Sequence, residues 1–278
     1  MLYSSSAIAT EPLGAILGPE GAVYFGTMDA GDNDDGAIFQ LQPPRAPGEP
    51  WSTSVVYSFP GPGAEQGEEN EPWSLILGPN GAFYGTIGFG GAPPTYPGAV
   101  FEVRPPAAPG GAWTQTILHN FQADTDGSTP NSLTAGSDGT LYGTTFGTPD
   151  IAGYPGPYGL GTAFMLTPPA VPGGSWTKTT LAQLSAGDER GPNSPLILRN
   201  GNLYGTTSSG PSNPGGMVFE LKPPTALGDP WTTTYLHGFD DTMPGGTLVM
   251  DESGALYGAT QAFFTAPAQG IVYRIAPE

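Results

Sequence analysis

The sequence contains no cysteine and very few basic residues. Lys and Arg number 7 against 25 Asp and Glu, so the 278 residues carry a formal net charge of −18. The absence of cysteine excludes disulfides, zinc–thiolate sites, iron–sulfur clusters and thiol nucleophiles. The scarcity of Lys and Arg excludes nucleic acid and anionic membrane surfaces as partners, because both are bound through cationic side chains.

Long apolar runs are also missing. None approaches the roughly 18 residues that a membrane-spanning helix needs, so we expect no membrane insertion. Residues 1–6 have neither the basic segment nor the apolar core of a signal peptide. The protein is therefore either cytosolic or a mature form to which Met1 was added. The repeats described below favour the second alternative, and with it an extracellular or periplasmic location.

Glycine and proline are abundant instead. The chain has 44 glycines and 33 prolines, a content that without periodicity would indicate low complexity. It is also 37% hydrophobic and 11% aromatic, which is too apolar for a solvated coil. Glycine and proline must therefore separate ordered elements.

An aromatic-Gly-Thr signature occurs four times along the chain and recurs a fifth time, slightly altered, as Tyr257-Gly258-Ala259. Successive signature glycines are 59, 58, 62 and 53 residues apart. A second aromatic follows in each copy, and in four copies it precedes a Pro-Pro pair and a tryptophan. These anchors define a repeat of about 55 residues. The signature glycines are Gly26, Gly85, Gly143, Gly205 and Gly258, and the second aromatics are Phe39, Phe101, Phe164, Phe219 and Tyr273.

Each copy contains four short runs of β-branched and aromatic residues. In the second copy they span residues 74–77, 82–85, 99–103 and 113–118, and a tight turn at 78–81 joins the first two. Five copies of four antiparallel strands predict one all-β domain over residues 1–278, a five-bladed β-propeller. The last copy lacks a fourth strand, and the Leu-Tyr-Ser segment at residues 2–4 matches Val56-Tyr57-Ser58 of a fourth strand, so we expect the N-terminal strand to close the ring. The predicted blades are 12–59, 72–121, 130–185, 192–239 and 244–275 plus 1–6.

The repeat resembles a known family. The sequence Leu-Tyr-Gly-Thr-Thr, then Gly-x-Val/Ala-Phe-x-Leu-x-Pro and Trp-Thr, is similar to the Gly-rich "GloVer" tandem-repeat family over essentially the whole chain. The resemblance implies a secreted bacterial protein with a propeller-like fold, and it supplies no catalytic motif. The chain departs from the family in lacking an anchoring segment and in a long insertion in the third copy.

Propeller connectivity sorts the loops into two ends. Loops between first and second strands, and between third and fourth strands, define the uniform end, where their lengths are similar. The other loops define the variable end, where we expect function. Sixteen of the 25 acids fall in variable-end loops, whereas Arg190 is the only basic residue there. This distribution predicts a negative face that attracts cations or cationic partners, although exposed acids equally serve solubility.

A shared proline precedes each inner strand at the variable end, and the residue after it is expected at the channel mouth. Trp73, Asn131 and Asn193 occupy this position, and an aromatic beside amides is typical of sugar recognition. An Asn-Ser pair that merely turns the chain into the strand is the alternative. Aromatic residues of the long loops would either cap the same mouth or pack on one another. The residues expected to cap it include Tyr96, Tyr158 and Phe263.

Metal and catalytic motifs are sparse. His119 and His237 fall in fourth strands, where a structural role is expected, and no nucleophile elbow or nucleotide fingerprint occurs. Calcium is the one cofactor that the sequence leaves open, because oxygen ligands cluster in two loops, although the twelfth position of a calcium loop is Ala135. The candidate calcium ligands are Asp29, Asp32, Asp34, Asp124 and Asp126.

Three hypotheses for function follow. The first is a monomeric, non-catalytic extracellular propeller that binds a glycan or another small ligand at its acidic variable end. The second is an enzyme that uses the same mouth, either a carbohydrate-active hydrolase or lyase, or a cyclase or lyase acting on a small organic substrate; paired carboxylates would serve glycoside hydrolysis. The third is a structural or adhesive repeat protein. The candidate catalytic residues are Glu71, Asp126, Asp188, Arg190 and Asp240.

Overall fold

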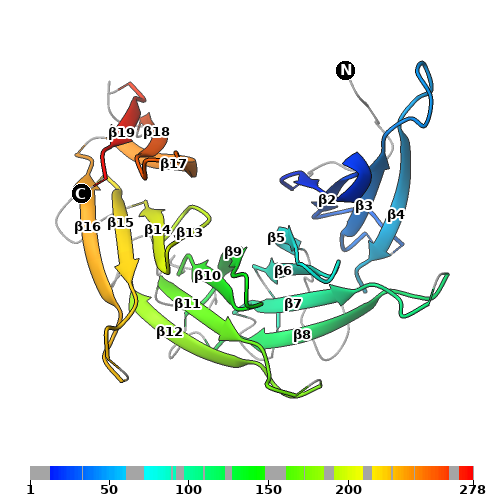
Figure 1. Cartoon of the computed structure of the whole chain (residues 1–278), viewed down its shortest axis with the longest axis horizontal. Helices are drawn as coiled ribbons and strands as arrows, with labels where there is room; N and C mark the ends of the chain where they lie inside the picture. Colours follow the sequence, from blue (N-terminus) through cyan, green and yellow to red (C-terminus); the bar gives the residue numbers. More distant parts are fainter. Residues whose placement is uncertain are drawn as a thin grey trace, which may run out of the picture. The chain divides into compact units, whose positions relative to one another are not determined.

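The chain forms antiparallel β-sheets throughout the part that the computed structural model describes (Figure 1). Its contacts divide it into two units, residues 1–121 and 122–278. The structure describes residues 13–32, 34–60, 72–88, 90–91, 97–108, 110–122, 127–147, 161–171, 173–184, 191–208, 215–226, 228–240, 242–262 and 269–277.

The first unit contains two four-stranded sheets, each ordered as its strands follow in the chain. A 3-10 turn, η1, at Pro19–Gly21 joins the first two strands. The first sheet consists of β1 (Ile16–Leu17), β2 (Val23–Thr27), β3 (Ala37–Gln42) and β4 (Ser52–Ser58). The second consists of β5 (Pro72–Leu77), β6 (Phe83–Ile87), β7 (Ala99–Arg104) and β8 (Thr114–Asn120).

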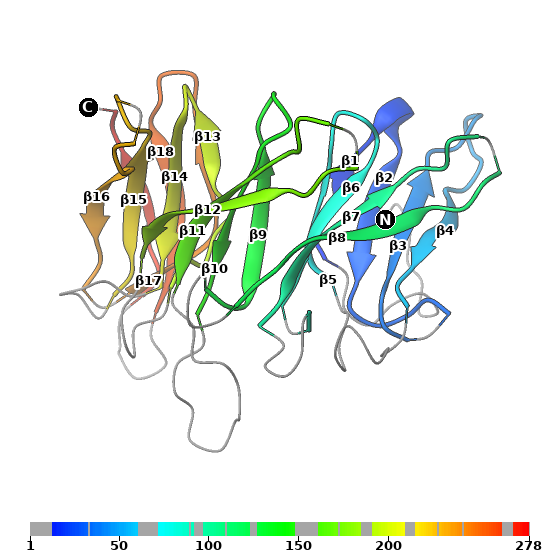
Figure 2. The same ribbon diagram turned by 90° about the horizontal axis from the view of Figure 1, so that it is seen from below.

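The second unit contains three sheets, the last of which has three strands. Figure 2 shows the turns from β9 to β10, β13 to β14 and β17 to β18 at one end of this unit, the uniform end. The third sheet consists of β9 (Pro130–Ala135), β10 (Leu141–Thr145), β11 (Thr162–Thr167) and β12 (Thr177–Gln183). The fourth consists of β13 (Ile197–Arg199), β14 (Asn202–Thr207), β15 (Met217–Lys222) and β16 (Thr232–Gly238), and the fifth of β17 (Thr242–Met250), β18 (Leu256–Ala262) and β19 (Val272–Ile275).

Burial follows the place of each strand in its sheet. β6 and the first five residues of β7 are buried, as expected for middle strands packed on both faces. The fourth strand β8 alternates exposed and half-buried residues over its first four positions, as expected for a strand with one solvated face. The cores therefore lie between sheets, and in the first unit Phe59, Phe83 and Phe101 belong to one buried cluster.

A β-bulge recurs in all four of the four-stranded sheets. The register between third and fourth strands shifts just before the second aromatic of the copy, so that one extra residue of the fourth strand has no partner across the ladder. The extra residue is always apolar. The bulged residues are Val56, Leu118, Leu181 and Leu236.

The second aromatic lies over the signature glycine. Gly85 pairs with Phe101 across β6 and β7, and a Cβ atom built on Gly85 would lie 2.8 Å from Cε1 of that ring. The corresponding distances to the Cε1 atoms at the third, fourth and fifth copies are 2.9, 3.0 and 3.0 Å. The signature therefore contains glycine because the ring occupies the volume of a side chain.

The first copy differs from the alignment that the sequence suggests. Tyr24 pairs with Gln40 as Tyr84 pairs with Glu102, so Phe25 rather than Gly26 stands at the position of Gly85. Phe25 stacks on Phe39, with ring centroids 5.3 Å apart and an angle of 12° between the rings. The signature Phe25-Gly26-Thr27 is thus displaced by one residue from its counterparts.

The five antiparallel sheets confirm the predicted repeat of short strands. In the fifth sheet, β19 pairs with β18 alone among the described strands, and Val272 is 84% exposed. Val100 and Val218, at the same position of other copies, are 0% exposed. Residues 1–6, predicted to cover this edge, lie outside the described residues, and the single-domain assignment over 1–278 stays a prediction.

We expect Gly85→Ala to lower the free energy of unfolding by about 1–3 kcal/mol, because the added methyl group must displace the Phe101 ring. Urea denaturation measures the loss. Gly14→Ala is the matched control, since its Cβ would meet no atom within 4 Å. Equal stability of the two variants would contradict the packing argument.

Candidate functional site

The proline that precedes each inner strand is buried at the variable end. Pro72, Pro130, Pro192 and Pro244 all have little solvent exposure. Pro72 and Pro244 each lie against a glycine that precedes the third strand of the preceding copy, since a Cβ on Gly36 or Gly216 would meet the proline Cδ at 2.9 or 2.5 Å. The starts of β5 and β17 are thereby fixed against the neighbouring sheet.

Asn131 and Asn193 link adjacent sheets of the second unit through equivalent hydrogen bonds. Nδ2 of Asn131 donates to the carbonyl oxygen of Pro192 at 2.7 Å, and Nδ2 of Asn193 donates to that of Pro244 at 2.6 Å. Each Oδ1 accepts a hydrogen bond from a threonine of the second strand of its own sheet, Thr144 or Thr206. Both asparagines are half-buried. The structure thus gives each amide a structural role, and contact with a ligand stays a prediction.

Hydroxyl groups continue this polar row along the inner strands. Ser132 and Thr144 share a hydrogen bond of 2.9 Å, as do Ser74 and Thr86 in the first unit. Ser132 also donates to the carbonyl oxygen of Ser194 at 3.4 Å. Ser132, Thr144 and Thr86 are buried, so these hydroxyl groups join strands within the protein.

Trp73 occupies in the first unit the position that asparagine takes in the second. It is half-buried in β5, and its indole lies against the backbone of Gly88, where a Cβ atom would come within 2.7 Å of Cε3. The indole can occupy this position only because residue 88 has no side chain. Trp73 is half-buried, and stacking of its indole on a ligand stays a prediction.

The acidic residues of the variable end are described only in part. Asp29, Asp32, Asp34 and Asp35 lie between β2 and β3, and Asp240 follows β16 in an exposed position. Burial, followed by the charge of Asp34, raises the pKa of Asp35 above its usual range. In the ranges that the structure describes, no three His, Asp or Glu side chains gather to hold a metal ion.

The remaining candidates lie outside the described residues. They are the catalytic candidates Glu71, Asp126, Asp188 and Arg190, the aromatic residues Tyr96, Tyr158 and Phe263, and the calcium candidate Asp124. His119 and His237 lie in the fourth strands β8 and β16 as predicted, and each packs edge-on against the ring of a following phenylalanine.

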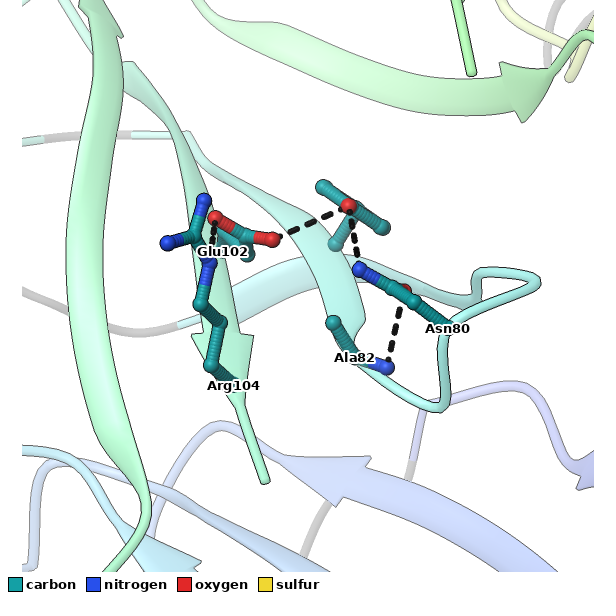
Figure 3. Close-up of polar contacts among 5 residues, drawn as sticks. Asn80, Ala82, Glu102 and Arg104 are labelled. Atoms are coloured by element: carbon teal, nitrogen blue, oxygen red, sulfur yellow. Dashed lines mark hydrogen bonds and ion pairs between the residues drawn. The ribbon is translucent and has the colours of Figure 1, made fainter. Parts of the chain in front are cut away.

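Sequence reasoning missed a polar cluster at the uniform end (Figure 3). Tyr84 donates a hydrogen bond to Oε1 of Glu102 at 3.0 Å, and Nε of Arg104 lies 2.8 Å from Oε2 of the same carboxylate. Glu102 is 1% exposed. Burial, followed by the charge of Glu102, raises the pKa of Tyr84, and the same carboxylate raises that of Arg104. The fourth sheet repeats the arrangement with Tyr204, Glu220 and Lys222.

A sequence signal for this cluster exists. Glu-x-Arg and Glu-x-Lys stand directly before the Pro-Pro pairs of the second and fourth copies. The glutamate is the cross-strand partner of the signature tyrosine. Read together with the strand register, this spacing would have predicted the contact.

The fold and the repeated signature define the class of protein. Tandem antiparallel sheets of this kind are propeller-like, and the aromatic-Gly-Thr anchors identify the type of repeat. The chain belongs to the Gloeobacter/Verrucomicrobia repeat family, whose model matches residues 11–273. The resemblance drawn from the sequence is thus confirmed. No curated protein matches the sequence.

Solved structures share the fold at low sequence identity. The PQQ-bound aldose sugar dehydrogenase of Streptomyces coelicolor matches with a TM-score of 0.56 and 15% identity, over 99% of this chain and 83% of that one. The gluconolactonase XC5397 of Xanthomonas campestris matches with a TM-score of 0.51 and 14% identity, over 97% and 77%. A chain of the nidogen/laminin complex matches with a TM-score of 0.52 and 13% identity, over 96% and 80%. At these identities the likeness establishes the fold alone.

We expect Asn193→Ala to lower the free energy of unfolding by about 1–3 kcal/mol without any ligand, because the carbonyl oxygen of Pro244 and the hydroxyl of Thr206 lose their partner. Chemical denaturation measures the effect. Gln269→Ala, at an exposed position, is the control. A residue that served ligand binding alone would show no loss in the free protein.

Proposed function

We propose that the protein is a carbohydrate-active enzyme that binds a small sugar or sugar derivative at the variable end of its sheets. The fold supports this choice over the non-catalytic alternative, since structures of the same fold include a sugar dehydrogenase and a gluconolactonase. Fold likeness alone does not determine function, so the proposal depends on the residues of the variable end.

The observation that carries the proposal is the buried proline at the start of the inner strands. In the sequence this proline is followed by the candidate contact residue, which is Trp73, Asn131 or Asn193, and is preceded by an acidic segment. The second N–H of each asparagine amide and the indole of Trp73 would then offer a hydrogen-bond donor and a stacking surface, the combination that suits a saccharide.

The acidic loops supply the proposed catalytic groups. Glu71, Asp126, Asp188 and Asp240 each lie within about four residues before a buried proline, and Arg190 lies two residues before Pro192. Two carboxyl groups held about 5–9 Å apart can act as acid and base, or as acid and nucleophile, in glycoside cleavage. An arginine beside them would stabilise developing negative charge.

Binding is tested with a panel of sugars, sugar lactones and short oligosaccharides by calorimetry, with and without Ca²⁺. We expect Trp73→Ala to weaken the affinity for any bound sugar at least tenfold, because the stacking surface is lost. Gly88→Ala should weaken it too, since a methyl group there displaces the indole. Trp51→Ala, in a connector at the uniform end, is the matched control. Unchanged affinity of both site variants would reject this site.

Catalysis is tested on the sugar that binds. We expect at least two of Glu71→Gln, Asp126→Asn, Asp188→Asn and Asp240→Asn to lower kcat at least a hundredfold while binding persists. Asp229→Asn, exposed at the uniform end, should leave kcat unchanged. A sugar that binds but is not converted would contradict the proposed enzyme and favour the hypothesis of a non-catalytic glycan-binding protein.

We further propose that residues 1–6 pair with the open edge of β19. The support is the exposure of Val272, whose counterparts Val100 and Val218 are buried. Deletion of residues 1–6 should lower the unfolding midpoint, and adding the free hexapeptide to the truncated protein should restore part of the loss. A truncated protein as stable as the full chain would reject this pairing.

A further inference from the structure

A cavity of about 410 Å³ opens at the uniform end of the second unit, between the fourth and fifth sheets. Its volume lies within the range of small-molecule sites. None of the residues proposed above for sugar binding or catalysis lines it. Its walls come from the turns after β13 and β17, from β14, β15 and β16, and from the segment after β19.

Buried polar groups form one wall of the cavity. Oε1 of Glu220 accepts hydrogen bonds from Tyr204 at 2.7 Å and from Nδ2 of Asn202 at 2.8 Å. Nζ of Lys222 lies 3.1 Å from Oε2, so both carboxylate oxygens have partners. The glutamate side chain is 8% exposed and that of Lys222 49%. The carboxylate therefore orients the lysine, whose side chain is partly exposed.

Arg199 also lines this cavity. Its guanidinium group donates to the backbone carbonyl oxygens of Asp251 and Glu252, in the turn between β17 and β18. This clamp connects the fourth sheet to the fifth. The rim is thus held in place by interactions within the protein, and a ligand would not have to order it.

The charged residues that line the cavity are Arg199, Glu220 and Lys222, which gives one net positive charge. This is unusual in a chain whose formal charge is −18. Nearby, the carboxylate of Asp251 accepts hydrogen bonds from Ser253 and Tyr257, and Arg274 donates to Tyr257. The charge of the cavity therefore favours an anion.

Apolar side chains complete the lining. Leu236, Leu256 and Ile275 lie among them, together with Pro277. An inorganic ion would leave this surface unused, whereas an organic ligand would cover it. The lining therefore selects a molecule that has both a charged group and an apolar face.

We propose that this cavity binds a small organic carboxylate, with the anionic group beside Lys222 and Arg199 and the carbon skeleton against the apolar wall. A cavity of about 390 Å³ occupies the equivalent position in the first copy, where it is lined by Tyr24, Gln40, Gln42 and Arg45. In both copies the fold therefore leaves a cavity beside a tyrosine at the same position of the second strand.

Calorimetry with galacturonate and benzoate, against galactose and benzamide as neutral counterparts, tests the proposal. At least one carboxylate should bind at least ten times more tightly than its neutral counterpart, and more weakly as salt concentration rises. Lys222→Gln should weaken binding about tenfold, whereas Lys222→Arg should retain it.

Arg104→Gln is the matched control, because it breaks the same ion pair in the second sheet, away from this cavity. It should leave the binding of both carboxylates unchanged, and Trp73→Ala at the variable end should leave the binding of benzoate unchanged. If Lys222→Gln fails to fold, two other measurements decide the proposal. They are the salt dependence of carboxylate binding to the unaltered protein and carboxylate binding to Lys222→Arg. Binding of neither carboxylate at millimolar concentration, equal binding of the charged and neutral compounds, or unchanged binding by Lys222→Gln would overturn the proposal.

Discussion

The contact between an aromatic ring and the glycine that it covers is the constraint on which the strand register and the bulge of the repeat depend. It brings the second and third strands of a sheet into register at Gly85 and Phe101, and equivalent pairs do so in the three following copies. The bulge lies next to this ring, and in the first, third and fourth sheets its additional residue, which is Val56, Leu181 or Leu236, belongs to or packs against a core cluster. The first copy meets the same constraint by stacking Phe25 on Phe39.

The sequence predicted the strands well because their signals are local. The runs at 99–103 and 113–118 correspond to β7 (Ala99–Arg104) and β8 (Thr114–Asn120), and the turn residues adopt the expected conformation, with φ of 75° at Gly81. The bulges and the shift in the first copy could not be found in this way. Both depend on which residues pair across a sheet. In the first copy two aromatic residues, Tyr24 and Phe25, precede Gly26, so either of them can be aligned with the signature tyrosine.

The candidate site was predicted only as a position in the fold. Asn131 and Asn193 occupy the expected place after the proline, yet their amides join one sheet to the next, through contacts between residues 61 and 51 positions apart. A single sequence gives no sign of such partners. The cluster around Glu220 escaped for a related reason, because its tyrosine, carboxylate and lysine meet only when two strands are paired. The residue types indicated which chemistry is available, whereas the pairing of the strands determines which side chains come into contact.

The hydrogen bonds of Asn131 and Asn193 run in one direction only. Each sheet donates from its own inner strand to the carbonyl oxygen of the next proline, and Gly245 ends the series because it has no amide side chain to donate. A head-to-tail contact of this kind is the same wherever it occurs in the array. Duplication or loss of the fourth copy would therefore preserve the asparagine–proline joints of the second unit, because Asn131 and Asn193 donate to equivalent carbonyl oxygens.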